Sequence, residues 1–295
     1  PTNDECLKSV FEEEVTRDRF LTRQAIFCPV VIRQGKEVLV EDPAKWRFPY
    51  LEENHRGQGG FGTVYAVKIA AGHFCRDQTV NPEPLELARK DYVISEGFKN
   101  KEHEVLEKIL ASDRSCPNIV DNFGCLAIGP NKYSLFMPLA ICDLSQYMME
   151  IHQFPPSATR ERAEIICSAR GLAGGLKFLH GEMKTPQGED LVCYHMDLKP
   201  SNILIFKSDE DKKIWKISDF GMARVKLKKK GDKVVKEKDF NAWFVKRPKH
   251  GPEPSSTGTR NQRGEGTYLA PESLASKSTM KTSSDVWSLG CVLSA

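Results

Sequence analysis

The chain has 295 residues and a formal net charge of +3, with 40% hydrophobic and 28% charged residues. These proportions are typical of a folded globular protein with a sizeable core, and the small net charge is no indication of nucleic-acid binding. No apolar run approaches the length of a membrane-spanning helix. The nine cysteines are scattered without a C-x-x-C pair, which favours a reducing compartment, cytoplasmic or nuclear, over a disulfide framework or a zinc site. The polar, acidic first residues do not resemble a secretory signal.

The first 45 residues carry the weakest pattern. Residues 11–27 could form one helix, with Phe11, Val15 and Phe20 on one side. Residues 28–32 are then expected to be extended, and Gly35 marks a turn before an apolar run. We expect an N-terminal extension over residues 1–45, ahead of a domain over residues 46–295.

A glycine-rich stretch follows at residues 56–65. It fits two phosphate-binding devices, the turn that opens a helix in a dinucleotide-binding unit and the tip of a β-hairpin lying over a nucleotide. The β-branched and aromatic residues 63–69 predict a strand, so the hairpin is favoured. Glycine suits such a tip because backbone N–H groups must approach phosphate and the turn needs positive φ. The candidate nucleotide-binding residues here are Gly57, Gln58, Gly59, Gly60, Phe61, Gly62 and Val64.

Two polar motifs stand beside apolar runs in the second half of the chain. Asp197, Lys199 and Asn202 precede the apolar run 202–206, and a second run at 214–217 leads into Asp219. A carboxylate can orient an attacking hydroxyl, and an amide oxygen with a second carboxylate can hold Mg²⁺ on phosphates. The alternative is a turn between two buried strands that happens to carry these residues, which two long motifs in order make improbable.

These motifs resemble H-x-D-L-K-P-x-N and D-F-G of the eukaryotic protein kinase family. The resemblance implies an α+β, bilobal fold, with a small β-rich N-lobe at about 46–140 and a mainly helical C-lobe at about 141–295. It implies ATP-dependent phosphorylation of serine or threonine hydroxyls on protein substrates. Asp197 would be the catalytic base, Lys199 would neutralise phosphoryl charge, and Asn202 and Asp219 would hold Mg²⁺. The alternative is a catalytically inactive pseudokinase or scaffold that binds nucleotide or partners only.

Two lysines compete for the role of the family's phosphate-pairing lysine. Lys68 stands in a matching Ala-Val-Lys sequence but lies only four residues beyond Val64, on the second strand of the hairpin. The family's lysine belongs on the third strand. Residues 87–93 match that strand better, so Lys90 is assigned, with Ala88 beside the nucleotide.

The partner of this lysine in the family is a glutamate on a helix, which the spacing predicts at residues 98–110. Glu102 and Glu104 are both candidates. Glu102 is preferred because Leu106 then follows one turn later on the inner face. The resemblance further assigns Met137, Leu139, Ala140 and Leu204 to the nucleotide pocket.

The segment from Asp219 to Glu272 resembles the family's activation segment. Thr267, in its closing motif, is the usual mark of serine/threonine specificity. The basic, proline-rich middle favours disorder, and a docking or import signal is the alternative. Met196 stands where many members carry an arginine that receives the phosphate of this segment. We therefore hypothesise that activity depends little on such phosphorylation.

A long helix is predicted over residues 162–180, and the longer loop after it resembles divergent fungal kinases. Asp285 is expected to bond the backbone of the catalytic loop. The chain stops 23 residues after Glu272, so we expect an incomplete C-lobe and Glu272 without the arginine that normally pairs with it.

Overall fold

A computed structural model gives the fold of the chain. It divides into two compact units, residues 1–97 with 122–139 and residues 98–121 with 140–295, and each is described by itself. The structure describes residues 7–27, 29–41, 46–59, 62–93, 101–112, 115–151, 158–208, 212–228, 267–273 and 280–294. Within these ranges no helix is long and apolar enough to cross a bilayer.

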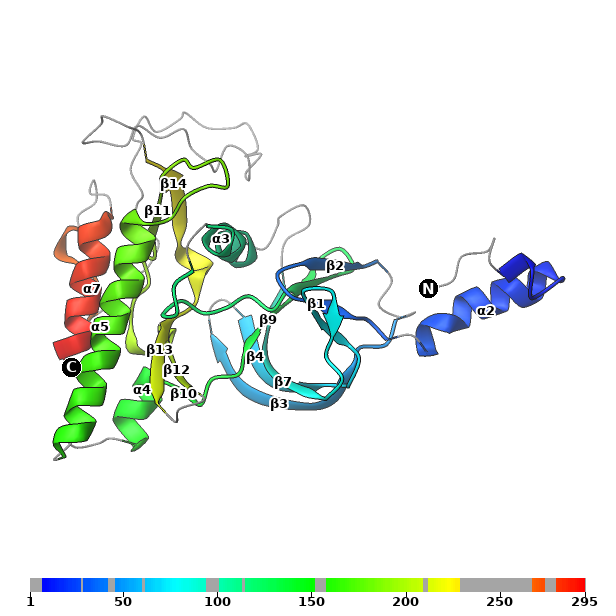
Figure 1. Ribbon diagram of the computed structural model, residues 1–295, viewed down its shortest axis with the longest axis horizontal. Coiled ribbons are helices and arrows are strands. Elements are labelled where there is room, and N and C mark those ends of the chain that lie inside the picture. The colour runs from blue at the N-terminus through cyan, green and yellow to red at the C-terminus, as the bar shows by residue number, and fades with distance from the viewer. Residues whose placement is uncertain are drawn as a thin grey trace. The chain divides into compact units, whose positions relative to one another are not determined.

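The first unit is built on a six-stranded sheet in the order β2-β8-β9-β7-β4-β3, whose curvature is visible in Figure 1. All its neighbouring strands are antiparallel except β2, which runs parallel to β8. Its strands are β2 (Glu37–Val40), β3 (Tyr50–Gly59), β4 (Gly62–Ile69), β7 (Leu85–Val93), β8 (Cys125–Ile128) and β9 (Lys132–Pro138). The two strands expected around 122–128 and 133–137 are thus present as β8 and β9.

The N-terminal part contributes directly to this unit. Helix α2 (Glu14–Phe27) begins three residues later than the predicted helix. Strand β1 (Ile32–Arg33) joins β5 (Phe74–Arg76) and β6 (Thr79–Val80) in a small second sheet. Val30, Ile32 and Val40 are buried in one core with side chains of the large sheet. Residues 30–40 therefore pack as part of the first unit.

Gly124 allows residues 30–40 to pack closely against the large sheet. Its φ is +102°, and a Cβ there would lie 2.2 Å from the backbone oxygen of Arg33. Only glycine allows both the left-handed conformation and this approach of two backbones. The parallel pairing of β2 with β8 begins at the next residue, Cys125 opposite Glu37.

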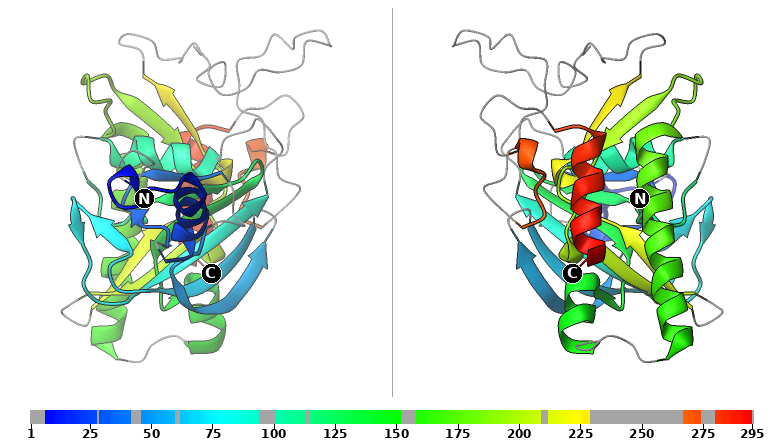
Figure 2. Two further views of the ribbon diagram at one scale, coloured as in Figure 1. Left: turned by 90° about the vertical axis from the view of Figure 1, so that its right-hand side faces the viewer. Right: turned by 90° about the vertical axis from the view of Figure 1, so that its left-hand side faces the viewer.

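The second unit contains the long helix α5 (Thr159–Gly181) and, packed against it, α7 (Thr282–Ser294), as Figure 2 shows. Leu172, Leu176 and Leu179 lie on the buried side of α5, as the apolar spacing predicted. The shorter helices are α3 (Lys101–Leu110), α4 (Leu144–Gln146) and the π-helical turn η1 (Tyr147–Ile151). Asp143 caps α4, since its Oδ1 accepts from the backbone N–H of Gln146 at 2.9 Å.

Short strands and turns of this unit position the polar motifs. Strand β11 (Leu191–Tyr194) pairs with β14 (Arg224–Leu227), and β12 (Ile203–Lys207) lies between β10 (Cys142–Asp143) and β13 (Lys213–Ile217). The 3-10 turns are η2 (Pro200–Asn202), η3 (Phe220–Met222) and η4 (Pro271–Ser273). Each polar motif thus lies at the end of a strand that buries apolar side chains.

Candidate active site

Asp197, Lys199 and Asn202 converge in the turn between β11 and β12. The Nδ2 group of Asn202 donates to the backbone oxygen of Asp197 at 2.8 Å and to its Oδ2 at 2.9 Å. Lys199 Nζ lies 3.3 Å from the same Oδ2. Asp197 is 1% exposed and Asn202 is 4% exposed, whereas the Lys199 side chain is 33% exposed. The turn therefore holds a buried carboxylate between an amide donor and a cation that reaches solvent.

The second motif is attached to the first through Ser218. The backbone N–H and the hydroxyl of Ser218 both donate to the backbone oxygen of Asn202, at 2.9 and 3.0 Å. The next residue, Asp219, has a left-handed backbone with φ 60° and ψ 72°, and its Oδ1 accepts from the N–H of Gly221 at 3.4 Å. A non-glycine residue in this region is strained, and such strain concentrates at functional sites. The backbone thus brings Asp219 to the turn that carries Asn202.

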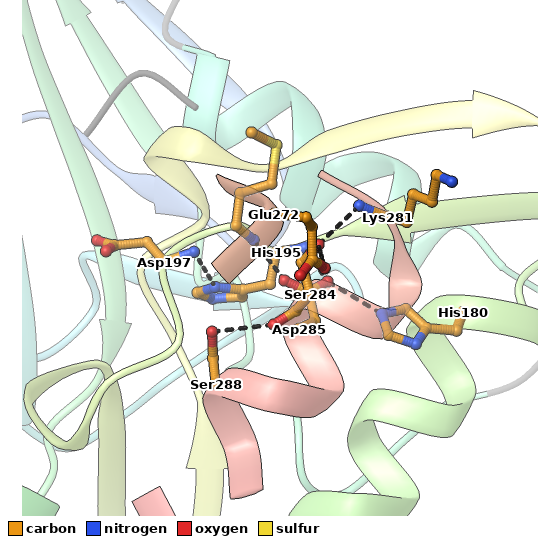
Figure 3. A network of polar contacts seen from close by, with 9 residues as sticks. His180, His195, Asp197, Glu272, Lys281, Ser284, Asp285 and Ser288 are labelled. Carbon is orange, nitrogen blue, oxygen red and sulfur yellow. Dashed lines mark hydrogen bonds and ion pairs between the residues drawn. The ribbon is translucent and has the colours of Figure 1, made fainter. Parts of the chain in front are cut away.

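His195 supplies a second link between the two motifs. Its Nδ1 accepts from the backbone N–H of Asp197 at 3.3 Å, so Nε2 carries the proton and donates to the Ser218 oxygen at 2.9 Å. The ring also meets Phe220 edge-on, with centroids 4.9 Å apart. In Figure 3 the Asp197 carboxylate points away from this ring. His195 therefore links the backbones of the two motifs, and the Asp197 carboxylate takes no part in this link.

Asp285, near the start of α7, bonds the catalytic loop as predicted. Its Oδ2 accepts from the backbone N–H of His195 and its Oδ1 from that of Met196, both at 2.8 Å. His180 Nε2 lies 3.0 Å from Oδ2 (Figure 3). The carboxylate is 1% exposed, so its charge is balanced inside the unit by two N–H dipoles and the histidine.

Met196 occupies an apolar cluster instead of a charged one. Its side chain is 2% exposed and packs with Met222, Leu269 and Met280, with Tyr194 at the margin. Its φ is 67°, in the left-handed region. Met222 follows the Asp219 motif and Leu269 belongs to the end of the activation segment. The position next to Asp197 is therefore surrounded by apolar side chains from three other segments.

Helix α3 carries the two candidate glutamates. Glu102 is 2% exposed, whereas Glu104 is only partly buried. The helix packs against η3, which contains Phe220. The burial is consistent with the choice of Glu102, and its pairing with a strand lysine stays a prediction. Residues 98–100 of the predicted helix lie outside the described residues.

The glycine-rich stretch forms a β-hairpin in the first unit. Gly57 pairs with Val64, Gln58 with Thr63 and Gly59 with Gly62 across β3 and β4. Gly62 has φ +143°, and a Cβ there would lie 2.4 Å from the backbone oxygen of Asp91. The choice of a hairpin over a helix opening is thus confirmed. Gly60 and Phe61, also predicted to bind nucleotide, lie outside the described residues.

Lys90 and Lys68 occupy different strands, as expected. Lys90 is 7% exposed in the middle of β7, between Val64 of β4 and Leu135 of β9. Lys68 lies on β4, with its side chain 35% exposed and paired to Glu52 at 3.3 Å. The buried lysine is therefore the one on the third long strand. Its contact with phosphate stays a prediction.

The remaining predicted nucleotide contacts lie on both units. Ala88 is 8% exposed and pairs with Ala66 and Met137, which is 6% exposed. Leu139 and Ala140 are half-buried just after β9, and Leu204 is half-buried on β12. Their role in a nucleotide pocket stays a prediction.

The activation segment is described only at its ends. The basic residues beyond 228 and the segment up to 266 lie outside the described residues, and Thr267 is exposed. Glu272, which we expected to be without the family's arginine, is bound by a hydroxyl, because Ser284 Oγ donates to Glu272 Oε1 at 2.7 Å. Ser288 Oγ also donates to the Tyr268 oxygen at 2.6 Å. Hydroxyls of α7 thus hold this end of the segment, a role that single serines do not signal in a sequence.

The donor set beside Asp197 fits a hard divalent cation. Asn202 uses both contacts of its Nδ2 group on Asp197, which leaves its amide oxygen as a ligand atom. Asp219 adds a carboxylate at the strand end that Ser218 bonds to this turn. Oxygen donors of this kind suit Mg²⁺.

A sheet unit with a glycine hairpin, together with a mainly helical unit that carries this loop, constitutes a protein-kinase-like fold. The chain belongs to the protein kinase family, since it matches the protein kinase domain over residues 50–295. It is 30% identical over 244 residues to a putative G-type lectin S-receptor-like serine/threonine-protein kinase of Arabidopsis thaliana, covering 83% of this chain and 23% of the relative. It is 28% identical over 275 residues to the serine/threonine-protein kinase CDG1 of the same plant, covering 88% and 51%.

The chain therefore spans about a quarter to a half of the length of these curated relatives. Both relatives are named serine/threonine-protein kinases. The resemblance to fungal kinases finds no support, because these relatives are plant proteins.

Proposed function

We propose that this chain transfers the γ-phosphoryl group of ATP to serine or threonine hydroxyls of protein substrates. The observation that carries the proposal is the bonded turn in which Asp197, Lys199 and Asn202 meet the strand end that bears Asp219. Family membership supports the same reaction. ATP and Mg²⁺ are the cofactors that this reaction requires.

Asp197 is proposed to orient the acceptor hydroxyl and to take its proton. Asn202 holds the Asp197 side chain by its 2.9 Å bond, so orienting this carboxylate costs little further entropy at the moment of reaction. Lys199, at 3.3 Å from the same oxygen, places a cation where negative charge develops on the transferred group. Positioning and charge neutralisation are the main contributions expected for phosphoryl transfer.

Asn202 and Asp219 are the residues that would hold Mg²⁺. The ion supplies charge neutralisation on the phosphate oxygens when it is bound. The chain's own contribution is to fix the two ligands, through the Ser218 bonds to the Asn202 backbone and through the left-handed turn at Asp219. Lys90 and the hairpin glycines are proposed as phosphate-binding groups, and Glu102 as the carboxylate that orients Lys90.

A transfer assay with labelled ATP, Mg²⁺ and a generic basic protein tests this proposal. Asp219→Asn should lower incorporation by about 100-fold or more, because a metal-ligand carboxylate is lost. Asp18→Asn is the matched control, since Asp18 is an exposed aspartate on α2, and it should retain full incorporation. Acid hydrolysis of the product should release phosphoserine and phosphothreonine. Label found on tyrosine alone would contradict the proposed acceptor class, and equal incorporation by Asp219→Asn would contradict the assigned ligand.

A further inference from the structure

A groove of about 460 Å³ lies beside α5, within the second unit and outside the proposed active site. One wall is a face of the helix, with Arg170 and Gly171 three and four residues after Cys167. The opposite wall is the turn over residues 115–118, which contributes Cys116 and Asn118. The groove is therefore built from two segments that are distant in sequence.

Glycine makes this close packing possible. A Cβ at Gly171 would lie 2.4 Å from Asn118 Nδ2. Asn118 is itself fixed, because its Nδ2 donates to the Trp215 oxygen and its backbone oxygen accepts from the N–H of Ile217, both at 2.8 Å. Ile217 ends β13, two residues before Asp219. A ligand in the groove would therefore contact the turn that holds the strand ahead of the proposed metal ligand.

Two thiols and one guanidinium give this groove its chemistry. Cys167 is exposed, whereas Cys116 is half-buried and its burial raises the pKa of the thiol. Since the thiolate is the nucleophile, the exposed thiol is the reactive one of the pair. Arg170 is exposed one turn along the same face, and in the described part of the chain it makes no ion pair. Its planar donors match a carboxylate.

The other charge at the groove is already balanced. Glu182 also lines the groove, and its Oε1 lies 2.7 Å from Lys177 Nζ. Among the described residues that line the groove, Arg170 is thus the cation available to a ligand, beside a nucleophilic thiol. An anionic molecule that carries its own reactive sulfur matches both groups.

We propose that this groove is a thiol-modification site for an anionic peptide disulfide of the glutathione class, with Cys167 as nucleophile and Arg170 as the carboxylate-binding residue. The Cys167 thiolate attacks one sulfur of the disulfide, and a bond forms between Cys167 Sγ and that sulfur. The original sulfur–sulfur bond breaks, and the second half leaves as a thiolate that takes up a proton. The protein thiol is oxidised to a mixed disulfide while half of the reagent is reduced to a thiol.

The test compares two disulfides on the whole chain, glutathione disulfide and the neutral 2-hydroxyethyl disulfide. Intact-mass measurement follows adduct formation, and peptide mapping locates it. One adduct per chain should form first at Cys167 with each reagent. Arg170→Ala should slow the reaction with glutathione disulfide roughly tenfold, the value of one charge-assisted bond, and should change the rate with the neutral disulfide less than about twofold.

Matched variants distinguish reaction at the proposed site from the general reactivity of an exposed thiol. Cys167→Ser should abolish the early adduct, while Cys116→Ser should preserve it. Arg160→Ala, which removes another arginine of α5 with a side chain 90% exposed, should leave both rates unchanged. Equal slowing of both reagents by Arg170→Ala, first labelling at another cysteine, or a Cys116–Cys167 disulfide as the main product would overturn the proposal. These readouts do not involve phosphate transfer, so they test this proposal independently of the proposed function.

Discussion

The Asp285 carboxylate accepts the backbone N–H of Met196 at 2.8 Å, which ties the start of α7 to the residue before the proposed catalytic base. Met196 has φ 67°, a conformation that costs a non-glycine residue on the order of 1 kcal/mol or more. The same carboxylate accepts the N–H of His195. The catalytic turn is therefore held in a strained conformation by a residue about 90 positions away.

Asp285→Asn should destabilise the fold and impair phosphate transfer. An amide offers one oxygen to the two N–H groups of His195 and Met196, so one buried donor loses its acceptor, at a cost of about 2 kcal/mol or more. Urea unfolding measures the first effect and a transfer assay the second. Val286→Ala, at a neighbouring position that is 56% exposed, should change neither. Wild-type stability in Asp285→Asn would show that the loop does not need this anchor.

The apolar cluster around Met196 predicts little dependence on phosphorylation of the activation segment. The described cluster around position 196 consists of Met222, Leu269 and Met280. It contains no anion with which an arginine placed at this position could pair. Met196→Leu should keep most activity, since this exchange conserves volume and typically costs less than about 1.5 kcal/mol. Met196→Arg should lose about tenfold or more because an unpaired charge is buried.

Phosphatase treatment before the transfer assay measures the dependence itself, and wild type should keep most of its rate. Met149→Arg serves as the control, because Met149 is 70% exposed and should tolerate the charge. Loss of activity on phosphatase treatment would count against the hypothesis, as would full activity in Met196→Arg.

Lys90→Met should abolish phosphate transfer, whereas Lys68→Met should retain most of it. Lys90 is buried within β7, while Lys68 pairs with Glu52 at a solvent-accessible position, where ion pairs are worth about 0–1 kcal/mol. Loss of a phosphate-binding cation is expected to lower the rate by about 100-fold or more. Initial rates at saturating ATP for both variants make the comparison. A more severe loss in Lys68→Met would reverse the assignment.

Cys193, on β11 just before the catalytic turn, predicts a loss of stability at alkaline pH. Complete burial raises the pKa of its thiol well above the usual 9.0, and the charge of Asp285 adds to this effect. Because the pKa of this thiol is higher in the folded state, the free energy of unfolding has its full value at pH values below the pKa of the thiol in the unfolded state. It decreases as pH rises, by about 1.4 kcal/mol per pH unit once the unfolded thiol ionises.

Urea midpoints at several pH values between about 8 and about 10 measure this effect. Cys193→Ala should flatten the decline relative to wild type, whatever its stability at neutral pH. Cys167→Ala removes an exposed thiol and should leave the decline unchanged. An identical pH dependence in wild type and Cys193→Ala would exclude Cys193 as the source.

Local patterns predicted which residues meet in the candidate site, because the proposed catalytic residues lie within a few positions of one another. Asp197 and Asn202 are five positions apart in one turn, and the glycine hairpin spans two adjacent strands. The strand assignment of Lys90 over Lys68 also followed from spacing, since a lysine four residues after Val64 has to lie on the same strand. These features depend on short-range geometry, which a sequence pattern encodes directly.

The contacts that span long distances in sequence were not predictable in the same way. Strand β2 pairs in parallel with β8 through residues 37 and 125, and nothing in a strand of four residues specifies so remote a partner. The Ser284 bond to Glu272 escaped prediction because a serine near a helix start more often caps its own helix. The hydrogen bond from His195 to the Ser218 oxygen could not be predicted either, since a sequence does not indicate which acceptor a histidine ring nitrogen binds.

The most direct test of the account is phosphate incorporation from Mg-ATP into a generic basic protein by wild type and by Asp197→Asn, measured side by side. The variant keeps the size of the side chain and its contacts with Asn202 and Lys199 change only in charge, so folding should be preserved. We predict clear incorporation by wild type and a decrease of about 100-fold or more in the variant. Equal incorporation by the two proteins would contradict the assignment of Asp197 as the base and with it the proposed phosphotransfer site.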